Sequence, residues 1–357
     1  MPIDDRTKGV MLKALDNNLG YKRGEKVVII AQRWGESLPK ESKSTLDRSI
    51  ELCEILDGVY NRNGVNVVLM TYVPSAPGST INPTAELYNK MEAYEIRRGV
   101  PEIVIAPCGY SITHTDFRVA QNKKGSRFAT MSNSSLAMFT AGGPFDIAGD
   151  YAKVVNETLE IAEKLRQSRY VRITGLNADL SIHIDQNLVH AGTGLITEPG
   201  SIDNWLGAEA YVVPVHPDAG GESHGWFNVP TGWGGRDPLK YDTMFVIERA
   251  RFVKVESKNR IKEEQRWVDS TLKPMIFGKP GYDVLAELGI GTNPAISDEY
   301  LLQNWSIAVA EKKRNSGKNK RTVHLAHGNS KGMGGTNDVD IHQDFLVLDV
   351  DEINFIK

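Results

Sequence analysis

Cysteine is scarce in this sequence, and neither sign of charge is in marked excess. The 357 residues include only Cys53 and Cys108, which form neither a zinc-binding spacing nor a disulfide framework. The net charge of −3 excludes the broad basic surface that nucleic-acid-binding and membrane-surface proteins use. The basic run at 312–321 is interrupted by Gly, Ser and Asn, which is typical of a solvated loop. We therefore expect neither a nucleic acid nor a membrane as a partner.

Long apolar runs are also absent. No segment approaches the roughly 20 apolar residues that a membrane span needs, and residues 1–9 lack the apolar stretch of a signal peptide. We therefore expect a cytoplasmic protein. A complete phosphate-binding fingerprint is missing too, because Gly289-Ile290-Gly291 has no third glycine and does not lead from an early strand into a helix. A nucleotide-binding role is unsupported.

The first half of the chain alternates strand and helix signals. Helical patterns lie at 46–60 and 85–98. Apolar runs rich in β-formers predict strands at 26–31, 65–73, 102–106 and 127–131. Strands separated by helix-length segments are typical of a parallel sheet covered on both faces. We predict an α/β, Rossmann-like domain, which a helix at about 150–167 closes.

From residue 170 the sequence changes to strand signals separated by polar loops. The signals read VRITG, DLSIHID, GLITE, EAYVVPV and TMFVIERARFVKVE. With 40% hydrophobic and 24% charged residues, a soluble chain of this length most simply forms two domains. We predict an α/β doubly wound domain at 1–168 and a β-rich α+β domain at 169–357.

The segment 322–344 concentrates residues that bind metal ions. It reads TVHLAHGNSKGMGGTNDVDIHQD and places His324, His342 and Asp344 around a Gly-rich loop. Alternate residues of a strand share a face, so His342 and Asp344 can point at one target. An imidazole beside a carboxylate suits zinc, cobalt, manganese or ferrous iron. The segment therefore predicts a divalent-metal site in the C-terminal domain, and with it a metal-dependent enzyme.

Other residues are candidates for the same site. His324 alternates with apolar neighbours and so belongs to a polar face, whereas His327 has the opposite parity and is either close to the ligands or structural. Glu287 follows an apolar run, and a buried carboxylate needs a partner such as a metal. Glu209, on a predicted strand, is a ligand, a proton shuttle or a surface charge. We take Glu209 and His327 as the candidate catalytic groups.

Large aromatic residues surround the long loop that follows Glu209. Trp205, His224 and Trp226 are candidate substrate-binding residues, with Trp233 nearby. The alternative is that the aromatic side chains anchor the loop to the domain core. Both interpretations are compatible with the sequence.

Four blocks in the second half resemble a known family. They read GAEAYVVPV (207–215), AELGIGTNP (286–294), TVHLAHG (322–328) and IHQD (341–344). Their order resembles the thermophilic leucyl aminopeptidase family, of the aminopeptidase T and S type, and especially its shorter relatives. The resemblance implies a two-domain α/β protein that forms dimers and holds one or two divalent ions. It implies these metal ligands: Glu209, Glu287, His324, His342 and Asp344.

The chain also departs from that family. Longer members have a catalytic Tyr where this sequence has Lys331, and the segment after Glu209 is enlarged. Our leading hypothesis is a hydrolase of an amide or other C–N bond in a small molecule or short peptide, in which metal-activated water attacks the carbonyl. The alternative is a non-haem Fe(II) ring-cleaving dioxygenase acting on a hydroxylated aromatic ring. Dihydroxypyridine dioxygenases are distantly similar and have a His at the position of Glu287. A scaffold without turnover is the third possibility.

Overall fold

The computed structural model describes most of the chain in two compact units. The described residues are 3–76, 81–132, 134–141, 143–146, 151–205, 208–232, 239–293, 314–315 and 319–357. The first unit takes in the described residues within Met1–Ala152 and Thr193–Gly207. The second unit takes in those within Lys153–Gly192, Ala208–Asp298 and Ile307–Lys357. The chain thus leaves the first unit and later returns to it. Whether 1–168 and 169–357 behave as separate domains stays a prediction.

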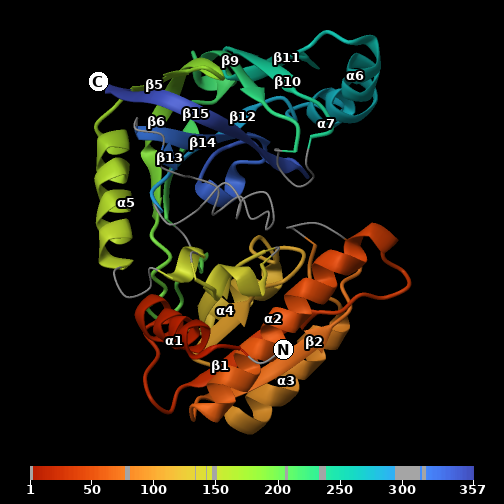
Figure 1. The fold of residues 1–357 in the computed structure, drawn as a ribbon, viewed down its shortest axis with the longest axis vertical. Helices are drawn as coiled ribbons and strands as arrows, with labels where there is room; N and C mark the ends of the chain where they lie inside the picture. The colour runs from red at the N-terminus through yellow and green to blue at the C-terminus, as the bar shows by residue number, and fades with distance from the viewer. Residues whose placement is uncertain are drawn as a thin grey trace. The chain divides into compact units, whose positions relative to one another are not determined.

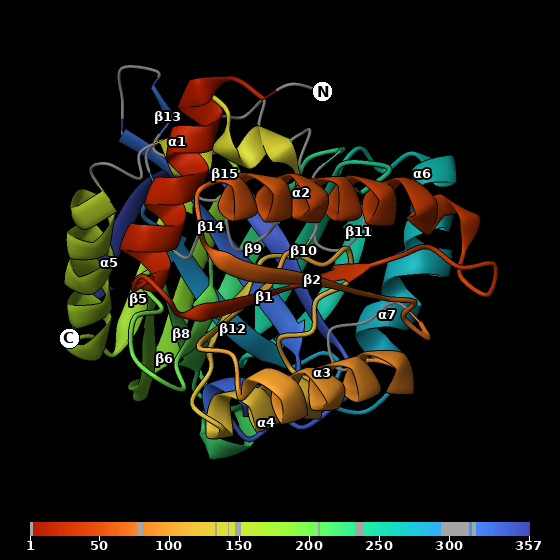
Figure 2. The same ribbon diagram turned by 90° about the horizontal axis from the view of Figure 1, so that it is seen from below.

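The first unit is built on a five-stranded parallel sheet of order β2-β1-β3-β4-β7. Its strands are β1 (Lys26–Gln32), β2 (Asn66–Tyr72), β3 (Ile103–Ala106), β4 (Arg127–Thr130) and β7 (Ile202–Asn204). Its helices are α1 (Asp5–Lys13), α2 (Lys43–Arg62), α3 (Ala85–Arg98) and α4 (Asp116–Lys123). Figure 2 shows α1 and α2 on one side of this sheet and α3 and α4 on the other. The residues of β1 after Lys26 are all buried, as expected for a parallel strand covered on both faces.

The predicted fold class of the first unit is confirmed. All four predicted strands and both interior helices form within a few residues of their predicted bounds. The fifth strand, β7, was not predicted, because it is short and comes from a later part of the chain. The segment GLITE at 194–198 was predicted as a strand of the second domain. It forms no strand and belongs to the first unit, so that prediction was wrong.

The second unit is β-rich, as predicted, and its strands pair antiparallel in a ten-stranded sheet. Its strands are β5 (Tyr170–Gly175), β6 (Ala178–Gly192), β8 (Glu209–Pro214), β9 (His224–Val229), β10 (Thr243–Glu248), β11 (Arg251–Ser257), β12 (Leu285–Gly291), β13 (Arg314–Asn315), β14 (Asn319–Gly328) and β15 (His342–Ile356). Its helices are α5 (Tyr151–Arg166), α6 (Lys262–Trp267) and α7 (Lys273–Phe277). Helix α5 lies beside β5 and β6 (Figure 1).

Part of this sheet closes on itself. Strand pairing runs from β6 through β5, β15, β14, β12 and β8 and back to β6, which makes a closed ring of antiparallel strands. From β6 the sheet continues outward through β9, β10 and β11. A closed ring leaves none of these strands as a free edge and fixes their register.

The ring strands have one apolar and one polar face. Fully buried apolar side chains occupy the first face: Leu288, Ile290, Val323, Leu325, Phe345 and Val347. Phe245 of β10 packs against Phe345, with ring centroids 4.4 Å apart. The alternate residues of β8, β12, β14 and β15 point to the other face, where the candidate site lies. Burial of the apolar face therefore fixes which residues reach the site.

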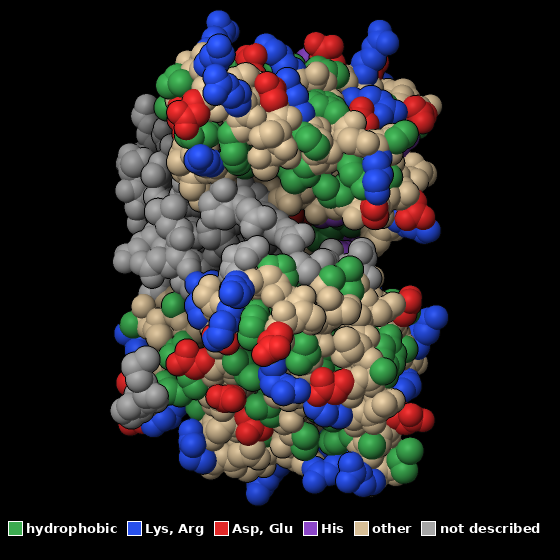
Figure 3. All heavy atoms as spheres, turned by 90° about the vertical axis from the view of Figure 1, so that its right-hand side faces the viewer, with side chains coloured by type: hydrophobic (Ala, Val, Ile, Leu, Met, Phe, Trp, Pro, Cys, Tyr) green, Lys and Arg blue, Asp and Glu red, His purple; other side chains and the backbone are tan. Residues whose placement is uncertain are grey.

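The face of the molecule drawn in Figure 3 carries charges of both signs. Lys and Arg side chains are interspersed with Asp and Glu over the face drawn in Figure 3, in keeping with the net charge of −3. In the described part of the chain, no helix is long and apolar enough to span a membrane.

Candidate metal centre

Strand register brings together residues that lie far apart in the sequence. Ala326 of β14 is paired with Glu287 of β12 on one side and with Asp344 of β15 on the other. His342 pairs with Gly328, one step further along the same face. Glu209, at the start of β8, pairs with Gly291 of β12. All five residues expected to be metal ligands therefore stand on one face of adjacent strands, within the second unit.

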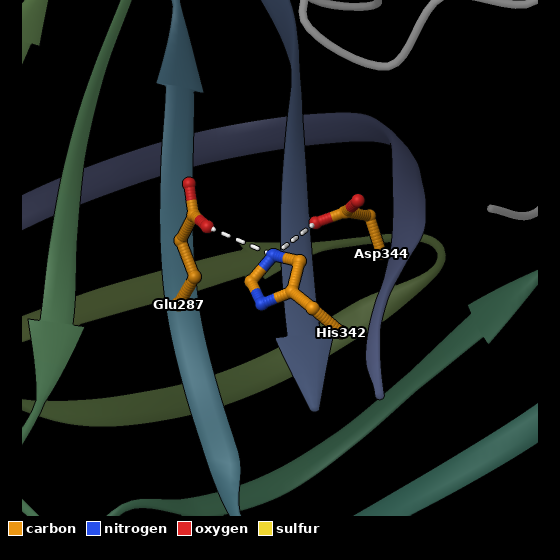
Figure 4. Close-up of side chains that lie close together, drawn as sticks. All are labelled: Glu287, His342 and Asp344. Atoms are coloured by element: carbon orange, nitrogen blue, oxygen red, sulfur yellow. Dashed lines mark ion pairs between the residues drawn. The ribbon is translucent and has the colours of Figure 1, made fainter. Parts of the chain in front are cut away.

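Glu287 lies at the centre of this cluster. Its Oε1 is 3.1 Å from Nε2 of His324, and its Oε2 is 3.2 Å from Nε2 of His342. Nε2 of His342 is also 3.3 Å from Oδ1 of Asp344. Figure 4 shows the imidazole of His342 between the two carboxylates. One carboxylate thus contacts both imidazoles.

His324 is the most deeply buried member of the cluster. It is 2% exposed, and Glu209 and Glu287 are each 7% exposed. Its Nε2 lies 3.9 Å from Oδ1 of Asp344, and its Nδ1 lies 3.6 Å from Oε2 of Glu209. The ring therefore has carboxylates on both sides.

Three of these residues have the arrangement of a metal-binding group. Ligand atoms of Glu287, His342 and Asp344 all lie within 4.8 Å of one another. It is the one such group of potential ligands found among the residues that the structure describes. Buried carboxylates need compensating positive charge, and a divalent cation provides it. The donor set of carboxylate oxygens and imidazole nitrogens fits zinc, cobalt, manganese or ferrous iron.

The cluster shows strong electrostatic coupling. Burial opposes ionisation of Glu287, but the hydrogen bonds and positive charge of His324 and His342 outweigh it and hold the pKa of this carboxyl well below its usual value. Burial also opposes charging of His342, yet the carboxylates of Asp344 and Glu287 raise its pKa well above the usual value. In both cases a positive charge among the carboxylates is favoured. A bound cation would replace the proton on His342.

The Gly-rich loop at 329–341 orients His342. Nδ1 of His342 is 2.7 Å from the carbonyl oxygen of Asn329, so Nδ1 carries a proton. Nε2 is therefore the nitrogen that would lose its proton and bind a cation between the carboxylates. The Asn337 side chain donates to the carbonyls of Gly281 at 2.8 Å and Gly328 at 2.5 Å. These bonds tie the loop to β14. Lys331, where longer family members have a Tyr, is exposed and forms an ion pair with Asp338.

Two small residues leave room for the cluster. A Cβ atom on Gly289 would lie 2.0 Å from Cε1 and 2.5 Å from Nε2 of His324. The imidazole therefore lies directly over the backbone of β12, which only glycine permits at this close approach. Ala326, between Glu287 and Asp344, leaves open the place between the two carboxylates. Sequence analysis noted Gly289 only as part of an incomplete nucleotide-binding pattern and missed this role.

His327 is not brought to the cluster. It lies on the apolar face of β14, fully buried, and stacks on Phe345 with ring centroids 5.8 Å apart. Its Nδ1 is 2.6 Å from the carbonyl oxygen of Tyr282. Burial lowers the pKa of His327 to about 4, which keeps the ring neutral. This position agrees with the structural role named in the sequence analysis, and the catalytic role of His327 stays a prediction.

The predicted substrate-binding residues stand on segments other than the four strands that carry the cluster. Trp205 is fully buried in the first unit, where it packs against Phe139 and Phe145. His224 and Trp226 lie on β9, which pairs with β6 and β10, and neither of those strands carries a cluster residue. The packing of Trp205 agrees with the alternative interpretation, in which the aromatic side chain anchors its segment to the domain core. Trp233 lies outside the described residues.

Comparisons with known proteins identify the fold. No family model matches the chain, and no curated protein matches it. A solved structure of 2,5-dihydroxypyridine dioxygenase from Pseudomonas putida KT2440 is similar, with a TM-score of 0.67 and 13% identity over 97% of this chain and 93% of that one. AmpT from Thermus thermophilus is similar with a TM-score of 0.53 and 13% identity, over 96% and 92% of the two chains. The resemblance predicted from the sequence is thus confirmed for the fold.

Proposed function

We propose that this protein is a metal-dependent hydrolase that cleaves an amide or another C–N bond. The observation that carries the proposal is the composition of the central group, which has two carboxylates, Glu287 and Asp344, and one imidazole, His342. Carboxylate-rich sites with an imidazole are typical of hydrolytic metal centres. The fold shared with AmpT supports this reading.

The residues of the candidate metal centre would have the following roles. Glu287, His342 and Asp344 would hold the cation, with Nε2 of His324 adjoining them. When bound, a divalent cation polarises a carbonyl and lowers the pKa of a coordinated water to about 7. Asp344 has the more exposed carboxylate of the pair, at 16% against 9% for Glu287. Asp344 would hold the cation through Oδ1, which faces His342, and we assign Oδ2 the acceptance of the proton that the attacking water loses.

An oxygenase is the second candidate. The fold is also that of 2,5-dihydroxypyridine dioxygenase, with the TM-score of 0.67. His324, His342 and one carboxylate would make the two-histidine, one-carboxylate set that binds ferrous iron. Against it stands Glu287, a second carboxylate that contacts both imidazoles. The small-molecule or short-peptide substrate, the dimer and the cytoplasmic location stay predictions in both cases.

The two candidates are separated by metal reconstitution. Protein stripped of metal would be loaded with zinc, cobalt or manganese and assayed on a panel of aminoacyl anilides and simple amides. A second portion would be loaded with ferrous iron without oxygen and then given oxygen and hydroxylated aromatic rings. We expect amide cleavage with the first set, which Glu287→Gln abolishes. Oxygen uptake with iron alone, and no cleavage of any amide by the metal-loaded protein, would contradict the hydrolase.

A further inference from the structure

The two nitrogens of His324 face different carboxylates. Nε2 is directed at the central group, 3.1 Å from Glu287 and 3.9 Å from Asp344. Nδ1 is directed at Glu209, 3.6 Å away. The lone-pair directions of the two imidazole nitrogens diverge, so one cation can be reached by only one of them. Glu209 therefore stands behind the His324 ring as seen from the central group.

The composition of the central group agrees with this geometry. Among the described residues, the atoms that gather within 4.8 Å come from Glu287, His342 and Asp344 and from neither His324 nor Glu209. His324 adjoins this group through Nε2, whereas Glu209 lies on the Nδ1 side of the ring. Glu209 begins β8, and its partner in the register, Gly291, is two residues beyond Gly289 on β12. Glu287, by contrast, sits next to Ala326 and Asp344 in the register. The two glutamates thus occupy opposite ends of the His324 ring.

We infer that Glu209 is a positioning residue for His324 and not a metal ligand. The inference rests on the proposed metal centre and departs from the ligand role that the family resemblance implies. At 3.6 Å the contact is longer than a hydrogen bond, so Glu209 acts through its charge. Glu287 lies nearer to Nε2, at 3.1 Å, so this effect of Glu209 would operate once a cation neutralises the central carboxylates. The carboxylate beside Nδ1 would then favour the tautomer with its proton on Nδ1, which leaves the Nε2 lone pair for the cation.

Gly289 completes this arrangement. Any side chain there would collide with Cε1, Nε2 and Nδ1 of His324, at 2.0, 2.5 and 2.6 Å from the Cβ position. The ring can therefore lie across β12 only because residue 289 has no side chain, and in that position it spans the distance between Glu209 and Glu287. The role of Glu209 is thus to set the proton position of a ring that Gly289 accommodates.

Binding of Co²⁺ to the full chain tests the inference without any substrate. Affinity would be measured by chelator competition, ion number by elemental analysis, and ligand environment by the visible absorption of Co²⁺. We expect Glu209→Gln to bind as many ions as the wild type, with an unchanged spectrum and an affinity lower by about 10- to 100-fold. Glu209→Asp, which keeps the charge, should recover part of the loss. Glu287→Gln, by contrast, should abolish Co²⁺ binding.

A double-mutant cycle makes the test specific. In the His324→Ala background, Glu209→Gln should have no further effect on Co²⁺ affinity, because Glu209 acts through that ring. Loss of one ion by Glu209→Gln, a changed spectrum, or an equal loss of affinity in the His324→Ala background would overturn the inference. If Glu209→Gln does not fold, Glu209→Ala, which also removes the carboxylate, carries the same comparison. Absence of Co²⁺ binding by the wild type would overturn the metal centre as well, whereas Co²⁺ binding without hydrolysis would overturn only the proposed reaction.

Discussion

Oε2 of Glu287 lies 3.2 Å from Nε2 of His342, although β12 and β15 are not neighbours in the sheet. Strand β14 lies between them, and its residues paired with Glu287 and His342 are Ala326 and Gly328. Because a methyl group occupies little of this space, side chains from the outer strands reach each other over it. The central group therefore depends on a small residue that binds nothing itself.

Removal of the central ligands should abolish metal binding. We expect His342→Ala to weaken Co²⁺ or Zn²⁺ binding by at least about 100-fold, because the mutation deletes one of the donors that converge within 4.8 Å. Chelator competition measures the change. Gln343→Ala is the matched control, since Gln343 pairs with His327 on the other face of the sheet. Equal losses for both variants would refute the assignment of His342.

Filling the space over Ala326 should block the site and leave the fold intact. Ala326→Val adds bulk between Glu287 and Asp344, so metal affinity should fall by about 10-fold or more, while overpacking costs about 1–3 kcal/mol of stability. Ala210→Val, on the apolar face of β8, controls for the cost of overpacking. Calorimetric titration with zinc and urea unfolding measure the two effects. Unchanged affinity in Ala326→Val would show that the ion binds elsewhere.

A side chain at residue 289 should displace His324. We expect Gly289→Ala to lower metal affinity by about 10-fold or more, because the new Cβ would overlap the imidazole. Gly9→Ala, where no atom lies within 4 Å of the new Cβ, is the control for loss of a glycine. In a His324→Ala background the effect of Gly289→Ala should disappear. A persistent effect there would indicate a backbone cause.

Burial of His327 should make the fold sensitive to acid. Its pKa falls from 6.5 to about 4 on folding. Below pH 6.5 the unfolded chain binds a proton at this residue, which the folded chain does not bind until pH falls to about 4. The free energy of unfolding should therefore decrease by about 3 kcal/mol across this interval. His327→Gln should reduce that decrease in urea unfolding at several pH values, whereas exposed His224→Gln should not.

Metal removal should lower thermal stability. An ion present at 100 times its Kd stabilises the folded state by about 2.7 kcal/mol, which corresponds to about 5–10 °C in Tm for a unit of this size. Differential scanning calorimetry with and without chelator measures the shift. In Glu287→Gln the chelator should have little effect, since the ion is already absent. A shift of the same size in that variant would place the stabilising ion at another site.

Much of the fold was predictable because its signals are local. Helix α3 begins and ends at the predicted residues, and the apolar runs at β1 to β4 are long enough to identify buried strands. The sequence analysis missed strand β7 and assigned the loop at 194–198 to a strand of the second domain. Both errors lie where the chain returns to the first unit. Short segments owe their structure to the sheet that they join, and that information is not in their own sequence.

The candidate site divides in the same way. By itself, the sequence determined which chemistry is available: carboxylates and imidazoles alternate with apolar residues in strands, so they must share a face opposite the core. Only the tertiary structure decided their mutual positions, since strand order and register depend on pairing between residues far apart in the chain. It placed Glu209 behind His324, His327 in the core and Trp205 in the other unit. The alternation of residues along a strand determines which face of the sheet a side chain lies on. The pairing of all the strands determines which side chains become its neighbours.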